Sequence, residues 1–225
     1  SVQYLSSDNT IEIWNNTTYW NAIIAIGKDE DSGLNQKQSK STNTDAILTI
    51  ALGTSVETTN IGNTNVFDDN FDFFAVGNND ESVAELDFSM AVPGTDCQRI
   101  YIGLERDWKV KNTGFVTGVS LEFDVTGFGD PDQFDLIVDE DFDGDYTTGT
   151  QRIVTTGSLT GTNLLFSNIT LNDGEVFTLV RKDPSAQIVY QAGTWLGGSG
   201  FANSLNNSGT DLLKSVHILE SVTLP

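Results

Sequence analysis

The sequence is poor in the residues on which many enzyme sites depend. It has one cysteine, Cys97, and one histidine, His217, in 225 residues. A lone cysteine cannot form an internal disulfide, so a small scaffold held together by several bridges is excluded. Zinc-protease (His-Glu-x-x-His), serine-hydrolase (Gly-x-Ser-x-Gly) and phosphate-loop motifs are missing. His217 lies in the alternating pattern of a terminal strand, which does not favour a Ser-His-Asp triad. We therefore expect the protein not to be an enzyme.

Basic residues are also scarce. Eleven Lys and Arg stand against 32 Asp and Glu, which gives a formal net charge of -21. Nucleic-acid binding needs a basic surface, so nucleic acid is not an expected partner. No apolar run reaches the roughly 18 residues of a membrane-spanning helix, so we expect no membrane span. The charge favours divalent cations as partners and solubility outside the cell.

The hydrophobic pattern is that of an all-β protein. Apolar residues alternate with polar ones over short stretches, and Gly, Asn, Asp and Thr separate these stretches. This spacing predicts a β-sandwich or a jelly-roll-like fold, built as one body or as two packed β-subdomains. The strands are expected near residues 11–14, 22–26, 46–52, 72–77, 84–90, 99–104, 107–113, 118–125, 134–138, 151–156, 163–166, 176–181, 188–192 and 215–223.

Changes in composition divide the chain into three parts. The Val92-Pro93-Gly94-Thr95 segment predicts a boundary between an N-terminal β-rich subdomain, 1–95, and a β-sandwich, 96–183. Residues 184–225 are expected to form a connector and a terminal strand, because 193–210 are rich in Gly, Asn and Ser. A strand isolated in this way has to join a sheet, either in its own domain or in a neighbouring module or like subunit, to which it would be donated.

The segment 139–146, Asp-Glu-Asp-Phe-Asp-Gly-Asp-Tyr, has the pattern of a calcium-binding loop. Carboxylates alternate at Asp139, Asp141 and Asp143, and Gly144 stands at position 6, where a calcium loop turns sharply. Asp145 follows as a fourth carboxylate. Four such groups repel one another unless a cation neutralises them. We therefore predict a Ca²⁺ site with Asp139, Asp141, Asp143 and Asp145 as ligands, against the alternative of a solvated acidic turn.

The loop differs from the helical calcium hand in two respects. Position 12 is Thr150, where a bidentate carboxylate is required, and no amphipathic helix flanks the loop. A calcium loop between two strands is the better interpretation, with the missing ligand supplied by Asp107, Asp135 or Asp173. A second acidic segment, 68–72, lacks the glycine turn and is expected to be a solvated loop.

Tryptophan side chains either fill a sandwich core or stack on sugar rings at a surface. Trp108 alternates with Val110 and is expected in the core. Trp14 and Trp20 flank a polar run, 15–18, and are candidate ligand-binding residues of a carbohydrate-binding module that would recognise surface glycans. A core position is the favoured interpretation for both.

The segment 33–41 reads Gly33-Leu34-Asn35-Gln36-Lys37-Gln38-Ser39-Lys40-Ser41. It is the most specific of several segments that resemble a module of large secreted, adhesin-like surface proteins of the Bacteroidota. The similarity covers residues 4 to about 180 and includes 4–8, 11–14, 47–52, 76–80, 106–110, 119–125, 136–146 and 173–179. Lys28 replaces an arginine of the family pattern, and a preceding helix rich in Leu and Tyr is missing.

The resemblance implies a non-enzymatic part of a cell-surface adhesin or extracellular filament, exported by the type IX secretion route. It brings no catalytic residues with it. No secretion signal is visible and the sequence opens with Ser1, so we expect a mature or excised part of a larger secreted protein. The sequence thus predicts a calcium-stabilised structural or adhesive module at the cell surface, with a lectin-like carbohydrate-binding module as the alternative.

Overall fold

The computed structural model describes residues 3–91, 97–154, 157–182 and 189–190, and these residues form strands, turns and loops. Their one helical element is a 3₁₀ turn, η1, at Pro131–Gln133. No helix in this described part is long and apolar enough to span a membrane. The chain divides into two compact units, residues 1–86 with 103–181 (unit 1) and 87–102 with 182–225 (unit 2).

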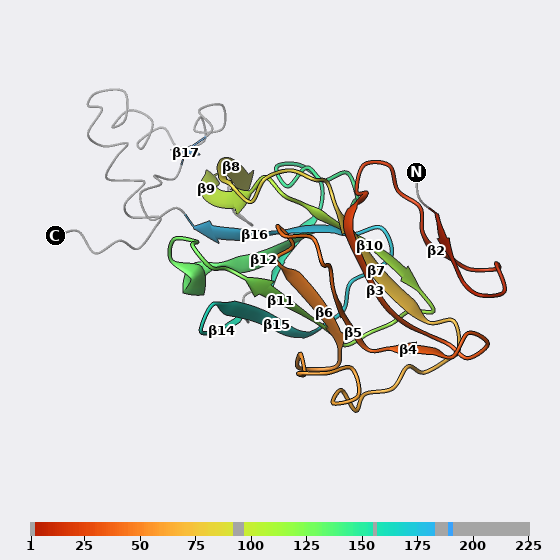
Figure 1. The fold of residues 1–225 in the computed structure, drawn as a ribbon. Helices are drawn as coiled ribbons and strands as arrows, with labels where there is room; N and C mark the ends of the chain where they lie inside the picture. Colours follow the sequence, from red (N-terminus) through yellow and green to blue (C-terminus); the bar gives the residue numbers. More distant parts are fainter. Residues whose placement is uncertain (1–2, 92–96, 155–156, 183–188, 191–225) are drawn as a thin grey trace, which may run out of the picture. The chain divides into compact units, whose positions relative to one another are not determined.

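Unit 1 consists of two packed antiparallel sheets and a small hairpin (Figure 1). The long sheet has the order β13 (Gln151–Val154), β12 (Asp135–Asp139), β16 (Val176–Lys182), β10 (Trp108–Thr113), β7 (Phe73–Asn78), β3 (Asn21–Asp29) and β4 (Leu34–Gln36). The short sheet has the order β14 (Ser158–Thr160), β15 (Asn163–Ile169), β11 (Val119–Asp124), β6 (Leu48–Leu52) and β5 (Gln38–Lys40). The hairpin pairs β1 (Tyr4–Leu5) with β2 (Glu12–Trp14).

The prediction of an all-β sandwich is confirmed, and alternation along the strands explains it. In β10, Trp108 and Val110 are buried, whereas Lys109 and Lys111 between and after them are partly exposed. Aromatic rings join the two sheets, because Phe123 of β11 packs edge-on against Trp108 of β10 at 5.4 Å between ring centroids. Trp108 also stacks on Phe177 of β16 at 5.9 Å. The predicted core position of Trp108 is thus confirmed.

Segments distant in sequence alternate within each sheet. β7 lies between β10 and β3, and β11 lies between β15 and β6. Residues on both sides of the predicted boundary at residue 95 therefore contribute to each sheet of unit 1. Unit 2 contains β8 (Glu85–Ala91) and β9 (Cys97–Leu104) for most of their length, and β17 (Val189–Tyr190). Both β8 and β17 pair with β9. The predicted strand at 215–223 lies outside the described residues.

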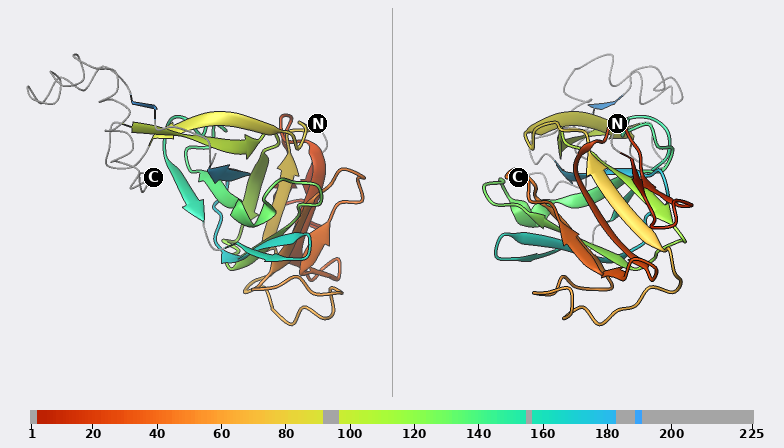
Figure 2. Two further views of the ribbon diagram at one scale, coloured as in Figure 1. Left: turned by 90° about the vertical axis from the view of Figure 1, so that its left-hand side faces the viewer. Right: turned by 45° about the vertical axis from the view of Figure 1, so that its right-hand side comes forward.

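The polar segment 29–44 contains the short strands β4 and β5. β4 pairs with β3 of the long sheet and β5 with β6 of the short sheet, so the chain changes sheets at Lys37. The Lys37 main-chain N–H donates to Asn60 Oδ1 at 2.6 Å, and its Nζ donates to the Asn63 carbonyl at 2.8 Å. The polar Gly-Leu-Asn-Gln-Lys-Gln-Ser-Lys-Ser segment therefore forms a corner of the sandwich, held by hydrogen bonds to the loop between β6 and β7. That loop runs along one end of unit 1 (Figure 2).

Candidate functional site

The acidic loop predicted to bind calcium connects two neighbouring strands of the long sheet. The buried run Leu136-Ile137-Val138 places β12 in the interior, and the strand ends at Asp139, whose side chain is also fully buried. The chain returns at Gln151, which pairs with Asp139 at the start of β13. The loop therefore stands between two strands, as predicted.

Three of the four predicted carboxylates converge. One carboxylate oxygen from each of Asp139, Asp141 and Asp143 lies within 4.8 Å of the others. The main chain wraps around Asp139, because Gly144 N–H donates to its Oδ2 at 2.7 Å and Asp141 N–H donates to its Oδ1 at 3.1 Å. Gly144 has φ of 80°, a left-handed conformation that glycine adopts without strain. The glycine at position 6 thus makes the sharp turn that the sequence pattern predicted.

The carboxyl groups of Asp139 and Asp141 influence each other's ionisation. Burial raises the pKa of Asp139, and its side-chain hydrogen bond with Asp141 raises it further. The same hydrogen bond lowers the pKa of Asp141. The pair therefore loses its first proton more readily than its second, because the second ionisation puts two negative charges side by side. A divalent cation at the cluster would stabilise both carboxylates.

Asp145 is not one of the three clustered carboxylates. Its Oδ1 accepts hydrogen bonds from the Thr147 N–H at 2.8 Å and the Thr147 hydroxyl at 2.5 Å, and its Oδ2 accepts one from the Thr148 hydroxyl at 3.1 Å. The Thr147 hydroxyl is the main reason that the pKa of Asp145 is lowered. In a calcium loop, position 7 contributes its main-chain carbonyl, and this remains open to Asp145.

The three candidates for a further ligand occupy different positions. Asp135 begins β12, at the opposite end of that strand from Asp139. Asp173 forms an ion pair with Lys111 at 3.2 Å. Asp107 lies close enough to Asp139 for their charges to interact, and its Oδ1 accepts a hydrogen bond from the Tyr146 hydroxyl at 3.0 Å. Burial raises the pKa of Asp107 to about 7.

Buried side chains pack against the loop and within it. Tyr146 is buried beside Asp107, and Tyr19 is buried with its hydroxyl facing Gly144. Burial raises the pKa of Tyr19 to about 12, so its hydroxyl keeps its proton. Lys109 lies 5.6 Å above the Tyr19 ring and donates to the Phe142 carbonyl at 3.0 Å, which ties the middle of the loop to β10.

Gly149 closes the loop against the acidic cluster. Its φ is 71°, and a Cβ atom at this position would lie 1.9 Å from Asp141 Oδ2. Any other residue would therefore displace the Asp141 carboxylate. Together with the Glu140 N–H bond to the Thr150 carbonyl at 2.8 Å, this close approach fixes the second half of the loop. The arrangement offers a hard cation several carboxylate oxygens on a loop that is already folded.

The other sequence candidates lie elsewhere. Trp14 is buried, as favoured, whereas Trp20 is 55% exposed and does not take the expected core position. The segment 68–72 differs from a fully solvated loop, because Asp72 is buried and its Oδ2 accepts a hydrogen bond from the Asp69 N–H at 2.8 Å. Burial raises the pKa of Asp72.

Sequence reasoning missed Tyr19, Lys109, Tyr146 and Gly149. Tyr146 and Gly149 could have been identified from the sequence, since they are the one tyrosine and the second glycine in a loop otherwise rich in Asp and Thr. Tyr19 and Lys109 approach the loop only through sheet pairing, because Lys109 on β10 faces Val176 on β16, which also pairs with Asp139. No local pattern in the sequence indicates such a contact.

Comparison with known proteins gives a family but no characterised relative. No curated protein and no solved structure matches the chain. One family model, described as a domain of unknown function (DUF8202), matches residues 1–175, which include the short sheet, the acidic loop and every strand of the long sheet named above except β16. The chain therefore belongs to the DUF8202 family.

Proposed function

We propose that the protein is a non-enzymatic structural or adhesive module of the cell surface, stabilised by a calcium ion in the loop 139–150. The observation that supports this most strongly is the convergence of the Asp139, Asp141 and Asp143 carboxylates around a glycine turn. Oxygen ligands at alternate positions suit Ca²⁺, which takes six to eight oxygens in flexible geometry. The ion would join the ends of β12 and β13 and so harden one end of the sandwich.

The position of the loop explains why the ion would matter mechanically. β12 lies next to β16, and Asp139 pairs with Val176 of that strand and with Gln151 of β13. An ion held at Asp139 would therefore oppose separation of the outer strands of the long sheet. The resemblance to secreted adhesin-like modules of the Bacteroidota favours export by the type IX route and a place in a longer adhesin or filament.

Assembly with like subunits or neighbouring modules by strand addition belongs to the same proposal. Within the described residues, the outer strands of the two sheets are β4, β5, β13 and β14, each three or four residues long. Such short edges resist unspecific pairing, so an added strand would need a defined register. Deletion of residues 214–225 tests this part, because assembly that survives the deletion would remove the terminal segment as the joint.

Thermal unfolding with and without calcium tests the calcium proposal. Free calcium at a hundred times its dissociation constant should stabilise the folded chain by about 2.7 kcal/mol. For a chain of this size, that corresponds to a rise in Tm of roughly 5–10 °C over the same protein in chelator. Asp143→Asn should lose most of this rise in Tm, because it removes one of the three clustered carboxylates. Asp143 is exposed, so the substitution should leave the packing of the fold unchanged.

Asp31→Asn is the matched control, since Asp31 is an exposed aspartate in another loop and outside the cluster. It should keep the full rise in Tm. An equal midpoint in calcium and in chelator for the unmodified chain would remove calcium from the proposal. An equal loss in both variants would show that only overall negative charge matters.

A further inference from the structure

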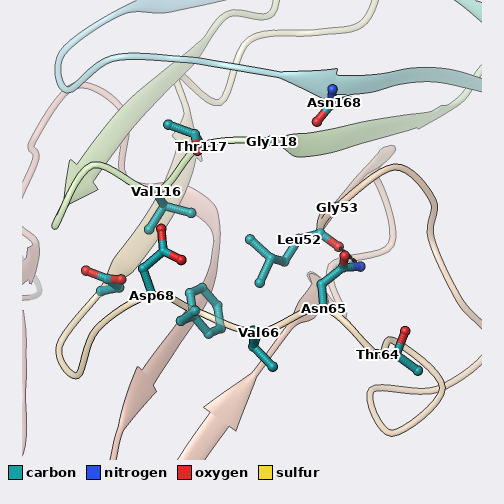
Figure 3. A pocket seen from close by; sticks show the side chains of 12 residues that line it. Leu52, Gly53, Thr64, Asn65, Val66, Asp68, Val116, Thr117, Gly118 and Asn168 are labelled. Atoms are coloured by element: carbon teal, nitrogen blue, oxygen red, sulfur yellow. Dashed lines mark hydrogen bonds between the residues drawn. The ribbon is translucent and has the colours of Figure 1, made fainter.

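A hollow of about 470 Å³ opens at one end of unit 1, beside the loop between β6 and β7 (Figure 3). Its walls come from the end of β6, from residues 64–68 of that loop, from the turn before β11 and from Asn168 of β15. Its volume falls in the range of small-molecule sites, about 300–1,000 Å³. None of the residues predicted as site residues from the sequence lines it.

Hydrogen bonds to the sandwich fix the walls of this hollow. Asn65 Nδ2 donates to the Leu52 carbonyl at 3.0 Å and to Asn63 Oδ1 at 2.8 Å. Gly53 leaves room for this contact, because a Cβ atom there would lie 2.1 Å from Asn65 Nδ2. Gly53 N–H also donates to the Gly118 carbonyl at 2.7 Å, which joins two of the walls. The hollow is therefore formed before any ligand arrives.

One side chain of the wall is held toward the hollow by an irregular backbone. Asn168 has φ of 55° and lies where the pairing of β11 with β15 shifts register. Shifts of this kind re-aim side chains, and strained conformations concentrate at functional sites. The Asn168 amide stands beside Gly118 in Figure 3, and among the described residues it has no hydrogen-bonding partner. It is available for a ligand.

The chemistry of the lining indicates what kind of ligand fits. The exposed polar groups are the hydroxyls of Thr64 and Thr117, the amides of Asn65 and Asn168 and the carboxylate of Asp68. Lysine, arginine and histidine are not among the lining residues, and Asp72 adds a second carboxylate. An anionic ligand is therefore disfavoured, whereas a neutral ligand with many hydroxyl groups finds both donors and acceptors.

A second hollow, of about 270 Å³, adjoins the first, because Val116 and Thr117 line both. It is also lined by Phe115, whose side chain is 89% exposed. Phe115 has φ of 58°, which is rare for a bulky residue. A ring held out in this way can cover the apolar face of a sugar ring, as exposed aromatics do in recognition surfaces.

From these observations we infer that the two hollows bind a neutral oligosaccharide. One sugar ring stacks on Phe115, and the hydroxyls of the next hydrogen-bond to Thr117, Asn168 and Asp68 in the larger hollow. This inference gives the adhesive function proposed above a ligand class, and it rests on that function only for its biological meaning. The binding groups lie outside the loop 139–150, so the folded protein binds the sugar without calcium.

The test is binding of the intact 225-residue chain to an array of neutral, sialylated and sulfated oligosaccharides, in calcium and in chelator, below the unfolding temperature. Titration calorimetry then measures the affinity of the best neutral oligosaccharide. Phe115→Gly and Asn168→Gly remove the binding groups without backbone strain, because both positions have positive φ. Each should weaken binding at least tenfold while Tm changes little. Asn9→Gly, at an exposed asparagine with φ of 62° outside the hollows, should bind as the unmodified chain does.

Binding of no neutral oligosaccharide overturns the inference, and so does binding that both glycine variants retain at full affinity. Selective binding of sialylated or sulfated oligosaccharides also overturns it, because the lining offers no basic group. The calcium proposal fails by a different result, an unchanged Tm in chelator. If the chain binds sugar but its Tm is the same in calcium and in chelator, the inference holds and the calcium proposal fails. If calcium raises the Tm but no oligosaccharide on the array binds, the calcium proposal holds and the inference fails.

Discussion

Gly149→Ala should reduce the stabilisation that calcium gives to the fold. The added methyl group would lie 1.9 Å from Asp141 Oδ2, so the carboxylate has to leave its place in the cluster. Losing one ligand should weaken calcium binding at least tenfold, which is about 1.4 kcal/mol. At a calcium concentration that stabilises the unmodified chain by about 2.7 kcal/mol, the variant should keep only about half of that stabilisation.

The left-handed backbone adds a cost that is independent of calcium. Alanine at φ of 71° should destabilise the fold by roughly 1–2 kcal/mol in chelator as well as in calcium. Gly161→Ala separates the two effects, because Gly161 has φ of 62° but no atom within 4 Å of its Cβ position. This control should show the backbone cost alone and keep the whole calcium effect.

Chemical denaturation in calcium and in chelator measures both quantities for the three proteins. The prediction concerns the difference between the two conditions for each protein, so errors in the absolute free energy of unfolding cancel. If Gly149→Ala kept the full calcium stabilisation, Asp141 would not be a ligand and the assignment of the loop would be wrong.

Three further predictions concern a buried carboxyl group, a buried arginine and an aromatic ring of the core. Asp107 has a folded-state pKa of about 7, raised by burial, so its own contribution to stability in chelator should fall by about 3 kcal/mol as pH rises from about 4 to 7, measured in urea titrations as the difference between the unmodified chain and Asp107→Asn across that range. Arg106→Ala should destabilise the fold by about 1–3 kcal/mol in denaturant titrations, because the buried guanidinium donates to the half-exposed Asp45 carboxylate at 2.8 Å and to the Glu81 carbonyl at 2.6 Å; an unchanged free energy of unfolding would contradict a stabilising role for these bonds. Phe123→Ala should cost about 3–5 kcal/mol in the same assay, because the ring is fully buried between the two sheets, and a cost near zero would argue against this packing.

Much of the fold was predictable because its central strands are rich in apolar residues. β10 and β11 bury their aromatic and branched residues mainly at alternate positions, whereas β12 and β16 are nearly continuous buried runs, and each of these four strands was expected within two residues of its observed bounds. The strands β1, β4, β5 and β14 were not expected. They are two or three residues long and mostly exposed, so pairing with a neighbour, rather than their own apolar face, determines their structure.

The candidate calcium site was predictable only in its local part. The spacing of Asp139, Asp141, Asp143 and Gly144 indicated the cluster and the turn, because all of them lie in one continuous segment. The orientation of Asp145 was not predictable, since its carboxylate is taken by the hydroxyl of Thr147. The oligosaccharide site has no sequence signal of its own. Its residues come from segments that are far apart in the sequence, and they meet only once both sheets have formed.

A crystal structure of the chain grown in millimolar calcium tests the central claim most directly. The account predicts one ion at the end of β12, with oxygens of Asp139, Asp141 and Asp143 at the 2.3–2.6 Å typical of calcium. Water alone between these carboxylates, or an ion bound elsewhere while the loop stays free of metal, would contradict it.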